Sequence, residues 1–285
     1  MVSVEELLDR TTFGEGHLEL AVSGGADSTA LALLAHAAKR SATLHHVDHR
    51  LREGGAEEAL RVRELADRLG FFFEAHVVEV GHGPNLEARA RTKRFSVLPD
   101  NVATGHTAND RAASVLINLL RGAGSRGLST VAAGPRHPIV GLTRAETEAL
   151  CVHFGETFFT DPTNTDEAFL RNAVRRQLLP LASELAGRDV IALLNRSAEV
   201  LGKEDAYLDA LAKTMIVDPF DVAELRSAPP VLVARRLRHA LVHGGYFPSL
   251  AEIDRVLEVV NGQVIACELS GGRRVARSKG RLSIG

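Results

Sequence analysis

Along the first part of the chain, short apolar runs alternate with longer amphipathic stretches. The runs have the length of buried strands and are bounded by turn residues, which predicts strands over 18–23, 42–47, 71–80 and 101–106. The stretches between and after them carry apolar residues at helical spacing, which predicts helices over 27–40, 53–70, 85–98 and 107–121. Strands that alternate with helices indicate βαβ units, so we expect an α/β fold with a parallel sheet and helices on both faces.

The pattern changes after about residue 150. A turn with Asp161, Pro162 and Asn164 precedes helices that continue to about residue 214. The remaining segments suggest a linker, then short helices, then two or three short strands, over 217–220, 221–261 and 264–284. We therefore expect a large α/β domain, a helical linker and a smaller helical or α+β domain, over 1–185, 186–215 and 216–285.

Composition narrows the class of protein. Hydrophobic residues make up 45% of the 285 residues, enough for a core, and the formal net charge of −2 argues against a basic nucleic-acid coat. One segment departs from this average, because "GGRRVARSKGR" (271–281) carries basic residues and no acid. The two cysteines, Cys151 and Cys267, are far apart, which argues against a disulfide framework or an iron–sulfur site. We see no signal peptide and no membrane-spanning run, so we expect a cytoplasmic protein.

The six residues "SGGADS" (23–28), between a predicted strand and a predicted helix, are suited to binding an anion. Gly24 and Gly25 let the backbone turn and let phosphate oxygens come close, and the first N–H groups of the helix have no internal partner. Asp27 would repel a phosphate, but it is a reasonable ligand for a Mg²⁺ ion held between them. The segment lacks the lysine of the P-loop motif. Taken alone, it can also be an ordinary glycine turn with Asp27 or Ser28 as helix cap.

This loop resembles the pyrophosphate loop of the N-type ATP pyrophosphatases, the PP-loop group, whose members adenylate an oxygen and release pyrophosphate. Further segments follow in order: "HVDHRLR" (46–52), "ARTKRF" (90–95), "TGHTANDRAASVLINLLRGAGSRGL" (104–128) and "DPTNTDEAFLRNAVRRQLLPLA" (161–182). Together they closely resemble the bacterial tRNA(Ile)-lysidine synthases over about residues 18–182. The first predicted domain would then be the catalytic PP-loop domain and the last a tRNA-binding domain.

The resemblance implies a two-step reaction on the wobble cytidine of the isoleucine tRNA with a CAU anticodon. ATP, accompanied by Mg²⁺, first adenylates oxygen 2 of the cytosine. The amine of free lysine then attacks carbon 2 and AMP leaves. The product, lysidine, pairs with adenosine, and the tRNA then accepts isoleucine instead of methionine. Members of the family are often dimeric, so a homodimer is a further expectation.

The resemblance also assigns roles to residues. It implies that Asp27 binds the metal, that His106 assists at the reacting centre, and that Asp110 orients the lysine ammonium. Arg91 would contact lysine or a phosphate. The residues expected to bind ATP are Ser23, Gly24, Gly25, Ala26, Asp27, Ser28, Val47, Asp48 and Gly105. Those expected to contact tRNA or phosphate, where a solvated surface is the alternative, are Arg171, Asn172, Arg175, Arg273 and Arg274.

The sequence departs from the family pattern at three positions. Ala113 stands where the family usually has a glutamate, so one carboxylate that could bind metal or lysine is missing. Arg111 is unusual beside Asp110, and Phe95 replaces a common tyrosine. Two alternatives therefore stay open: a tRNA cytidine thiolase of the same ATPase group, and a relative that binds nucleotide or tRNA without catalysis. The isolated cysteines argue against the first, and the intact loop at 23–28 argues against the second.

Overall fold

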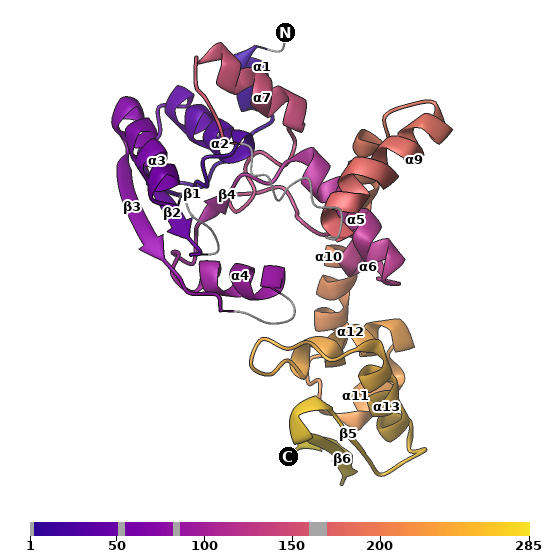
Figure 1. Cartoon of the computed structure of the whole chain (residues 1–285). Helices are drawn as coiled ribbons and strands as arrows, with labels where there is room; N and C mark the ends of the chain where they lie inside the picture. Colours follow the sequence, from indigo (N-terminus) through magenta and orange to yellow (C-terminus); the bar gives the residue numbers. More distant parts are fainter. Residues whose placement is uncertain (1–2, 51–54, 82–85, 160–169) are drawn as a thin grey trace. The chain divides into compact units, whose positions relative to one another are not determined.

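The computed structural model describes residues 3–50, 55–81, 86–159 and 170–285. They form two compact units, Met1–Gly202 and Lys203–Gly285, and the long helix α10 crosses the boundary between them (Figure 1). The predicted division into catalytic domain, linker and tRNA-binding domain remains a prediction. Among the described residues, we find no helix with the length and apolar character needed to cross a membrane.

The elements of the first unit follow the predicted alternation. The strands are β1 (Leu18–Ala21), β2 (Ala42–Asp48), β3 (Phe72–Val77) and β4 (Ala103–Thr104). The helices are α1 (Val4–Asp9), α2 (Ala26–Ala37), α3 (Gly55–Leu69), α4 (Leu86–Phe95), α5 (Ala108–Leu120), α6 (Ser125–Leu128), α7 (Arg144–His153), α8 (Leu170–Ala173), the π-helix η2 (Val174–Leu178), α9 (Leu179–Ala186) and the first half of α10 (Val190–Met215).

The four strands form one parallel sheet in the order β3-β2-β1-β4, which confirms the predicted α/β class. Helix α3 packs against β2 and β3, α2 packs against β1, and α7 lies against α2. The core consists mainly of leucines that these elements bury completely: Leu20, Leu31, Leu33, Leu34 and Leu44. The order of the strands in the sheet places the carboxyl ends of β1, β2 and β4 side by side. In open α/β sheets, ligands bind at this edge.

Some predicted elements differ from those observed. The strand predicted over 101–106 pairs with β1 only at Ala103 and Thr104, because His106 donates its backbone N–H to the carbonyl of Thr104 and turns the chain. Helix α7 was not predicted, although Thr143 and Glu146 form a capping box at its start. The helix after residue 170 widens into a π-turn ahead of Pro180, which has no N–H to donate. The predicted turn at 161–164 lies outside the described residues.

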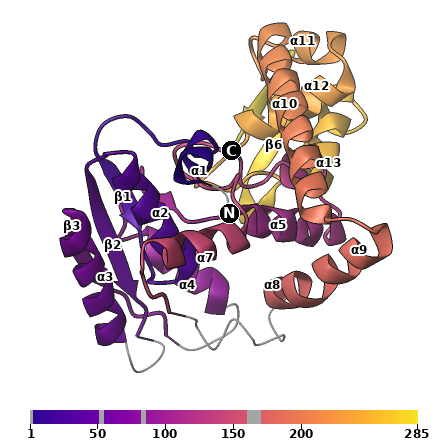
Figure 2. The same cartoon turned by 90° about the horizontal axis from the view of Figure 1, so that it is seen from above.

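The second unit, described by itself, contains a helical cluster and a small antiparallel sheet. Its elements are the end of α10, α11 (Val222–Ser227), α12 (Pro230–Ala240), α13 (Leu250–Asn261), β5 (Ala266–Glu268), the 3₁₀ turn η3 (Ser270–Gly272), β6 (Arg274–Ser278) and β7 (Arg281–Ile284). Figure 2 draws its helices in orange and its sheet, in the order β5-β6-β7, in yellow. The predicted short helices and strands are thus observed.

The buried carboxylate of Glu252 organises the start of α13 in this second unit. It accepts hydrogen bonds from the backbone N–H of Ser249 and Ser270, from the Ser249 hydroxyl and from the Tyr246 hydroxyl. The backbone N–H of Ser270, followed by that of Ser249, holds the pKa of Glu252 well below its usual range. The second unit therefore contains a buried, hydrogen-bonded carboxylate of its own as well as its own hydrophobic core.

An ion pair fixes α7 to the chain segment after α1. Arg10 donates to both carboxylate oxygens of Glu146, at 2.6 and 2.8 Å, and Glu146 also accepts from the backbone N–H and hydroxyl of Thr143. Although burial opposes ionisation, the hydrogen bonds from Arg10 and Thr143 lower the pKa of Glu146 to about 2. The ionised carboxylate is therefore a feature of the folded state over most of the pH range.

This pair gives a stability test with a defined pH dependence. Glu146→Gln should lower the free energy of unfolding by about 1–2 kcal/mol at pH 7, because one charge-assisted contact is lost. A carboxylate whose folded pKa is depressed stabilises above its unfolded pKa and loses that effect as pH falls toward the folded value. The difference between wild type and variant should therefore shrink between about pH 4.5 and 2 in urea unfolding followed by circular dichroism.

The matched control is Glu184→Gln, which removes an exposed glutamate from α9. It should change the unfolding free energy by less than about 0.5 kcal/mol at either pH. A Glu146→Gln difference that stays constant from pH 7 down to pH 2 would contradict the assignment of the pKa to this contact.

Candidate active site

The turn between β1 and α2 brings the predicted loop residues together at the start of a helix. Gly24 has φ of +82°, a conformation that favours glycine, and Gly25 precedes α2 in an extended conformation without a side-chain cap. Ser28 fixes the turn: its hydroxyl accepts from the backbone N–H of Ser23 at 3.2 Å and donates to the carbonyl of Gly25 at 3.0 Å. The first N–H groups of α2 and the positive end of its dipole thus face a glycine turn, which is an anion-binding arrangement.

Gly105 is required by the close approach of β4 to this helix. A Cβ at position 105 would lie 2.8 Å from the carbonyl oxygen of Asp27 and 2.9 Å from the backbone nitrogen of Ser28. Because those atoms belong to the backbone of the first turn of α2, they cannot move aside without moving the loop. Gly105, predicted as an ATP-binding residue, therefore sets the position of the loop.

The Asp27 carboxylate is held by two residues of α7 that the sequence analysis missed. Arg144 donates to Oδ2 at 2.8 Å and the Thr147 hydroxyl donates to Oδ1 at 2.6 Å. Burial raises the pKa of Asp27, and the Thr147 hydrogen bond and the Arg144 charge oppose that rise. The capping box that begins at Thr143 is a sequence signal that could have predicted this helix. No local pattern indicates that Arg144, the residue after Thr143, contacts Asp27.

His106 lies at the end of β4 in a group of hydrogen-bonded polar side chains. The Thr104 hydroxyl is 2.6 Å from Nδ1 of His106 and 2.9 Å from Nδ1 of His137, and the two rings meet edge to face. Burial, with the charges of Arg91 and other neighbours, lowers the pKa of His106 to about 4 against the opposing charge of Asp110. His106 is therefore neutral near pH 7, the form that can accept a proton.

Asp110 caps α5 with one carboxylate oxygen and faces an arginine with the other. Oδ2 accepts from the backbone N–H and the hydroxyl of Thr107, both at 3.1 Å, and Oδ1 is 3.5 Å from Arg175. Burial opposes ionisation, but Arg175, His106 and the Thr107 N–H together keep the pKa of Asp110 below its usual value. Asp110 is thus an ionised carboxylate beside a neutral histidine.

The predicted arginines approach this group from two directions. Arg175 on η2 pairs with Asp110, and Arg171 on α8 donates to the hydroxyl of Ser114 at 3.3 Å, one turn further along α5. Helix α8 indeed lies beside α5 (Figure 2). From α4, Arg91 stacks on the ring of Phe95 at 5.0 Å and contributes to the pKa shifts of both His106 and His137. The structure therefore brings Arg91, Arg171 and Arg175 near His106 and Asp110.

A cavity of about 500 Å³ adjoins Asp27 and Asp110 through their arginine partners. Among the described residues its wall includes Asn109, Arg144, Glu148, Asn172, Arg175 and Arg176. Arg144 also donates to Glu148 at 2.9 Å, and Asn109 accepts from the backbone N–H of Arg144. With several guanidinium groups and one carboxylate, the wall is suited to a ligand that carries both negative and positive charge.

Position 113, where the resemblance predicts a glutamate, lies in an apolar environment. Ala113 is fully buried and packs in an apolar cluster with Val174 and Leu179. Its neighbour Arg111 is also buried and donates to Glu199 at 3.1 Å. Ala113 therefore contributes to the packing of α5 against η2 and α9.

The remaining predicted residues are placed as follows. Val47 and Asp48 end β2 beside the loop, and the Asp48 carboxylate accepts from the backbone N–H of Arg50 at 2.8 Å. In the second unit, Arg273 donates to the carbonyl of Leu241 at 2.9 Å, which satisfies the end of α12, and Arg274 begins β6 with an exposed side chain. Contact of any of these residues with ATP or tRNA stays a prediction.

The parallel sheet and the Ser23–Ser28 loop define a PP-loop ATP-binding domain, and a family model described as the PP-loop domain matches residues 2–182. Curated tRNA(Ile)-lysidine synthases are similar over nearly the whole chain. That of Rhodococcus erythropolis is 36% identical, with 93% of this chain and 89% of the relative covered, and that of Thermus thermophilus is 37% identical, with 93% and 56% covered. The chain belongs to the tRNA(Ile)-lysidine synthase family.

A solved structure supports the fold alone. The U34-tRNA thiolase NcsA from Methanococcus maripaludis aligns with a TM-score of 0.54 at 13% identity, over 70% of this chain and 78% of that chain. At this identity the likeness shows a shared PP-loop architecture and carries no argument about the substrate.

The close approach at Gly105 yields a sharp test of the loop geometry. Gly105→Ala should reduce ATP-dependent pyrophosphate exchange at least about 100-fold, because the added methyl must displace the backbone at Asp27 and Ser28. Gly124→Ala is the matched control, since a Cβ there meets no atom within 4 Å and the backbone is extended. The control should retain activity within about 3-fold. Equal activity of both variants would show that the loop tolerates the displacement.

Proposed function

We propose that this chain ligates free lysine to carbon 2 of the wobble cytidine of tRNA(Ile) with a CAU anticodon. The reaction consumes ATP, passes through an adenylated cytidine, and releases pyrophosphate and AMP. The observation that carries the proposal is the similarity to enzymes of this name, which covers 93% of the chain at 36% identity and so includes the second unit. The geometry around Asp27 and Asp110 supports it, because it offers a phosphate loop beside paired acids and bases.

In the adenylation step, the Ser23–Ser28 loop would hold the two outer phosphates of ATP. The helix N–H groups and the serine hydroxyls stabilise the negative charge that grows on the leaving pyrophosphate. Asp27 fits the role of a Mg²⁺ ligand, since Mg²⁺ is usually bound by one or two carboxylates together with substrate phosphates. When bound, the ion would neutralise phosphate charge. Arg144, which donates to both Asp27 and Glu148, would be placed to contact the phosphates of ATP.

In the transfer step, the lysine amine must lose a proton before it attacks. Its reference pKa is about 10.4, so the neutral amine costs about 4.6 kcal/mol at pH 7. Asp110 would orient the ammonium through Oδ1, in competition with Arg175. His106, which is neutral near pH 7, would accept the second proton, the one that the attacking nitrogen loses once the carbon–nitrogen bond has formed and that nitrogen is far more acidic than a free ammonium. Arg91, close enough to influence His106, would contact the lysine carboxylate or the AMP phosphate.

We assign binding of tRNA to five polar residues of the two units, four of which are arginines. Arg171, Asn172 and Arg175 line or adjoin the cavity in the first unit, and Arg273 and Arg274 lie on the second. Guanidinium groups suit phosphate contacts that do not depend on sequence. The target cytosine has to leave the anticodon stack before it can reach the loop. A homodimer stays a prediction.

The cysteine arrangement argues against a thiolase reaction. Cys151 is completely buried against α2, and burial raises the pKa of its thiol to about 12, so it is a poor nucleophile near pH 7. Cys267, the other cysteine of the chain, belongs to the second unit. The binding-only alternative rests on Ala113, which packs in an apolar cluster and supplies no carboxylate, so the labelling experiment below decides between the two readings.

The first experiment is incorporation of labelled lysine into an isoleucine tRNA transcript with a CAU anticodon. We expect ATP-dependent labelling of this transcript and none of a methionine tRNA that carries the same anticodon. Labelling of the first alone would establish lysidine synthesis and show that Ala113 is tolerated. ATP binding without labelling would favour a relative that binds but does not catalyse.

Variants of Asp27 and Asp110 should distinguish the adenylation step from the lysine-transfer step. Asp110→Asn keeps an oxygen that can cap α5 but removes the negative charge facing Arg175. Lysine transfer should fall at least about 100-fold, while tRNA-dependent pyrophosphate exchange should fall less than about 5-fold. Asp27→Asn should abolish both steps, and the exposed Asp67→Asn in α3 is the control with neither loss. Equal loss of both steps in Asp110→Asn would rule out a lysine-specific role.

A further inference from the structure

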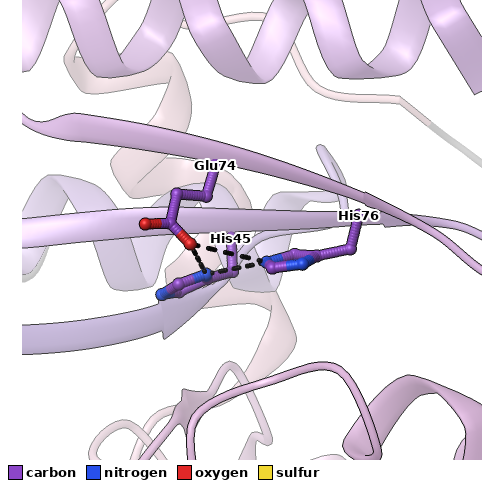
Figure 3. A group of neighbouring side chains, drawn as sticks. All are labelled: His45, Glu74 and His76. Atoms are coloured by element: carbon purple, nitrogen blue, oxygen red, sulfur yellow. Dashed lines mark hydrogen bonds and ion pairs between the residues drawn. The ribbon is translucent and has the colours of Figure 1, made fainter.

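Two histidines and a glutamate meet on one face of the sheet, separate from the ATP loop (Figure 3). The parallel register pairs His45 of β2 with Glu74 of β3, and His76 lies two residues further along β3. Because side chains alternate across a strand, all three point to the same face. Nδ1 of His45 is 3.0 Å from Nε2 of His76 and 3.5 Å from Oε2 of Glu74, and the last two atoms are 3.9 Å apart.

These separations are near those between the ligand atoms of a metal coordination shell. Bonds of about 2.0–2.1 Å in a tetrahedral zinc site place neighbouring ligand atoms about 3.3–3.4 Å apart. The three observed distances, from 3.0 to 3.9 Å, lie on both sides of that value. An octahedral ion with similar bonds would require about 3.0 Å for each cis pair. Two imidazole nitrogens and one carboxylate are also a donor set that zinc accepts, with water in the fourth position.

A second carboxylate prepares His45 to be a ligand. Oε2 of Glu19, on β1, lies 2.7 Å from Nε2 of His45. An ionised carboxylate can only accept, so Nε2 carries the proton and Nδ1 presents its lone pair to the cluster. Metal-binding histidines in proteins usually donate their other ring N–H to a carboxylate in this way. The charges of Glu19 and Glu74 together would balance a divalent cation.

The cluster is also accessible and electrostatically suited to a cation. The His45 side chain is 2% exposed, whereas that of Glu74 is 60% exposed, so an ion can enter from solvent. Without metal, Nε2 of His76 can donate its proton to Nδ1 of His45, which accounts for the 3.0 Å contact.

We propose that His45, Glu74 and His76 form a binding site for one Zn²⁺ ion, with Glu19 as the partner that orients His45. The ion would link β2 to β3, and through Glu19 to β1. It is distinct from the Mg²⁺ expected at Asp27, although the backbone carbonyl of His45 accepts from the N–H of Val22, directly before the loop. The proposal does not depend on the reaction that the chain catalyses.

The test is zinc binding to the full chain, freed of metal and without nucleotide, by competition with a chromophoric chelator. We expect one Zn²⁺ per chain. His76→Gln and Glu74→Gln should each weaken binding at least about 100-fold, and Glu19→Gln about 10–100-fold. His153→Gln, an exposed histidine at the end of α7, and Asp27→Asn are matched controls that should bind as wild type does. When Co²⁺ replaces Zn²⁺, the wild type should show the strong visible absorption of a tetrahedral ion. The cluster variants should not show it.

Folding is checked by circular dichroism and melting in EDTA, where wild type and Glu74→Gln should agree within about 3 °C because Glu74 is largely exposed. Saturating Zn²⁺ should raise the wild-type Tm by about 5–10 °C and leave that of Glu74→Gln unchanged. Absence of stoichiometric binding, or binding that both Glu74→Gln and His76→Gln retain, would overturn the proposal. In that case the cluster is a hydrogen-bonded histidine pair that shares a proton.

Discussion

The partly buried carboxylate of Asp27 makes the contacts on which the site depends. It joins the first turn of α2 to α7 through Arg144 and Thr147, while the backbone at the same residue touches Gly105 at the end of β4. Three elements that are far apart in the sequence therefore meet at one residue. A carboxylate removed from water needs such partners, and their geometry fixes where the loop presents its N–H groups.

In the rest of the site, each acidic side chain described also faces a basic side chain. Arg144 lies between Asp27 and Glu148, and Arg175 faces Asp110. An anionic ligand competes for the arginines and a cationic ligand competes for the acids. In the proposed reaction, binding of ATP and of lysine would therefore exchange partners within a network whose acidic side chains are already paired. Such exchange limits the electrostatic penalty of leaving either kind of charge unpaired.

The sheet offers two chemically different surfaces from the same strands. The carboxyl ends of β1, β2 and β4 lead into the phosphate loop, whereas one face of β1, β2 and β3 carries Glu19, His45, Glu74 and His76. The first surface follows from strand direction and the second from the alternation of side chains. The second surface depends on the parallel register, because a shift of one residue in β3 would move Glu74 and His76 to the opposite face.

The sequence by itself determined the α/β alternation, the glycine turn before α2 and the family to which the chain belongs, because these depend on local periodicity and on contiguous motifs such as "SGGADS". It placed Asp27, His106 and Asp110 in one site, and the structure brings the elements that carry them together. It could not indicate that Arg144 and Thr147 hold Asp27, that Ala113 faces an apolar cluster, or that His45 meets His76. Those contacts join residues between 30 and 120 positions apart in the chain. Only the tertiary structure decides them, since they follow from strand register and helix packing, which no local pattern encodes.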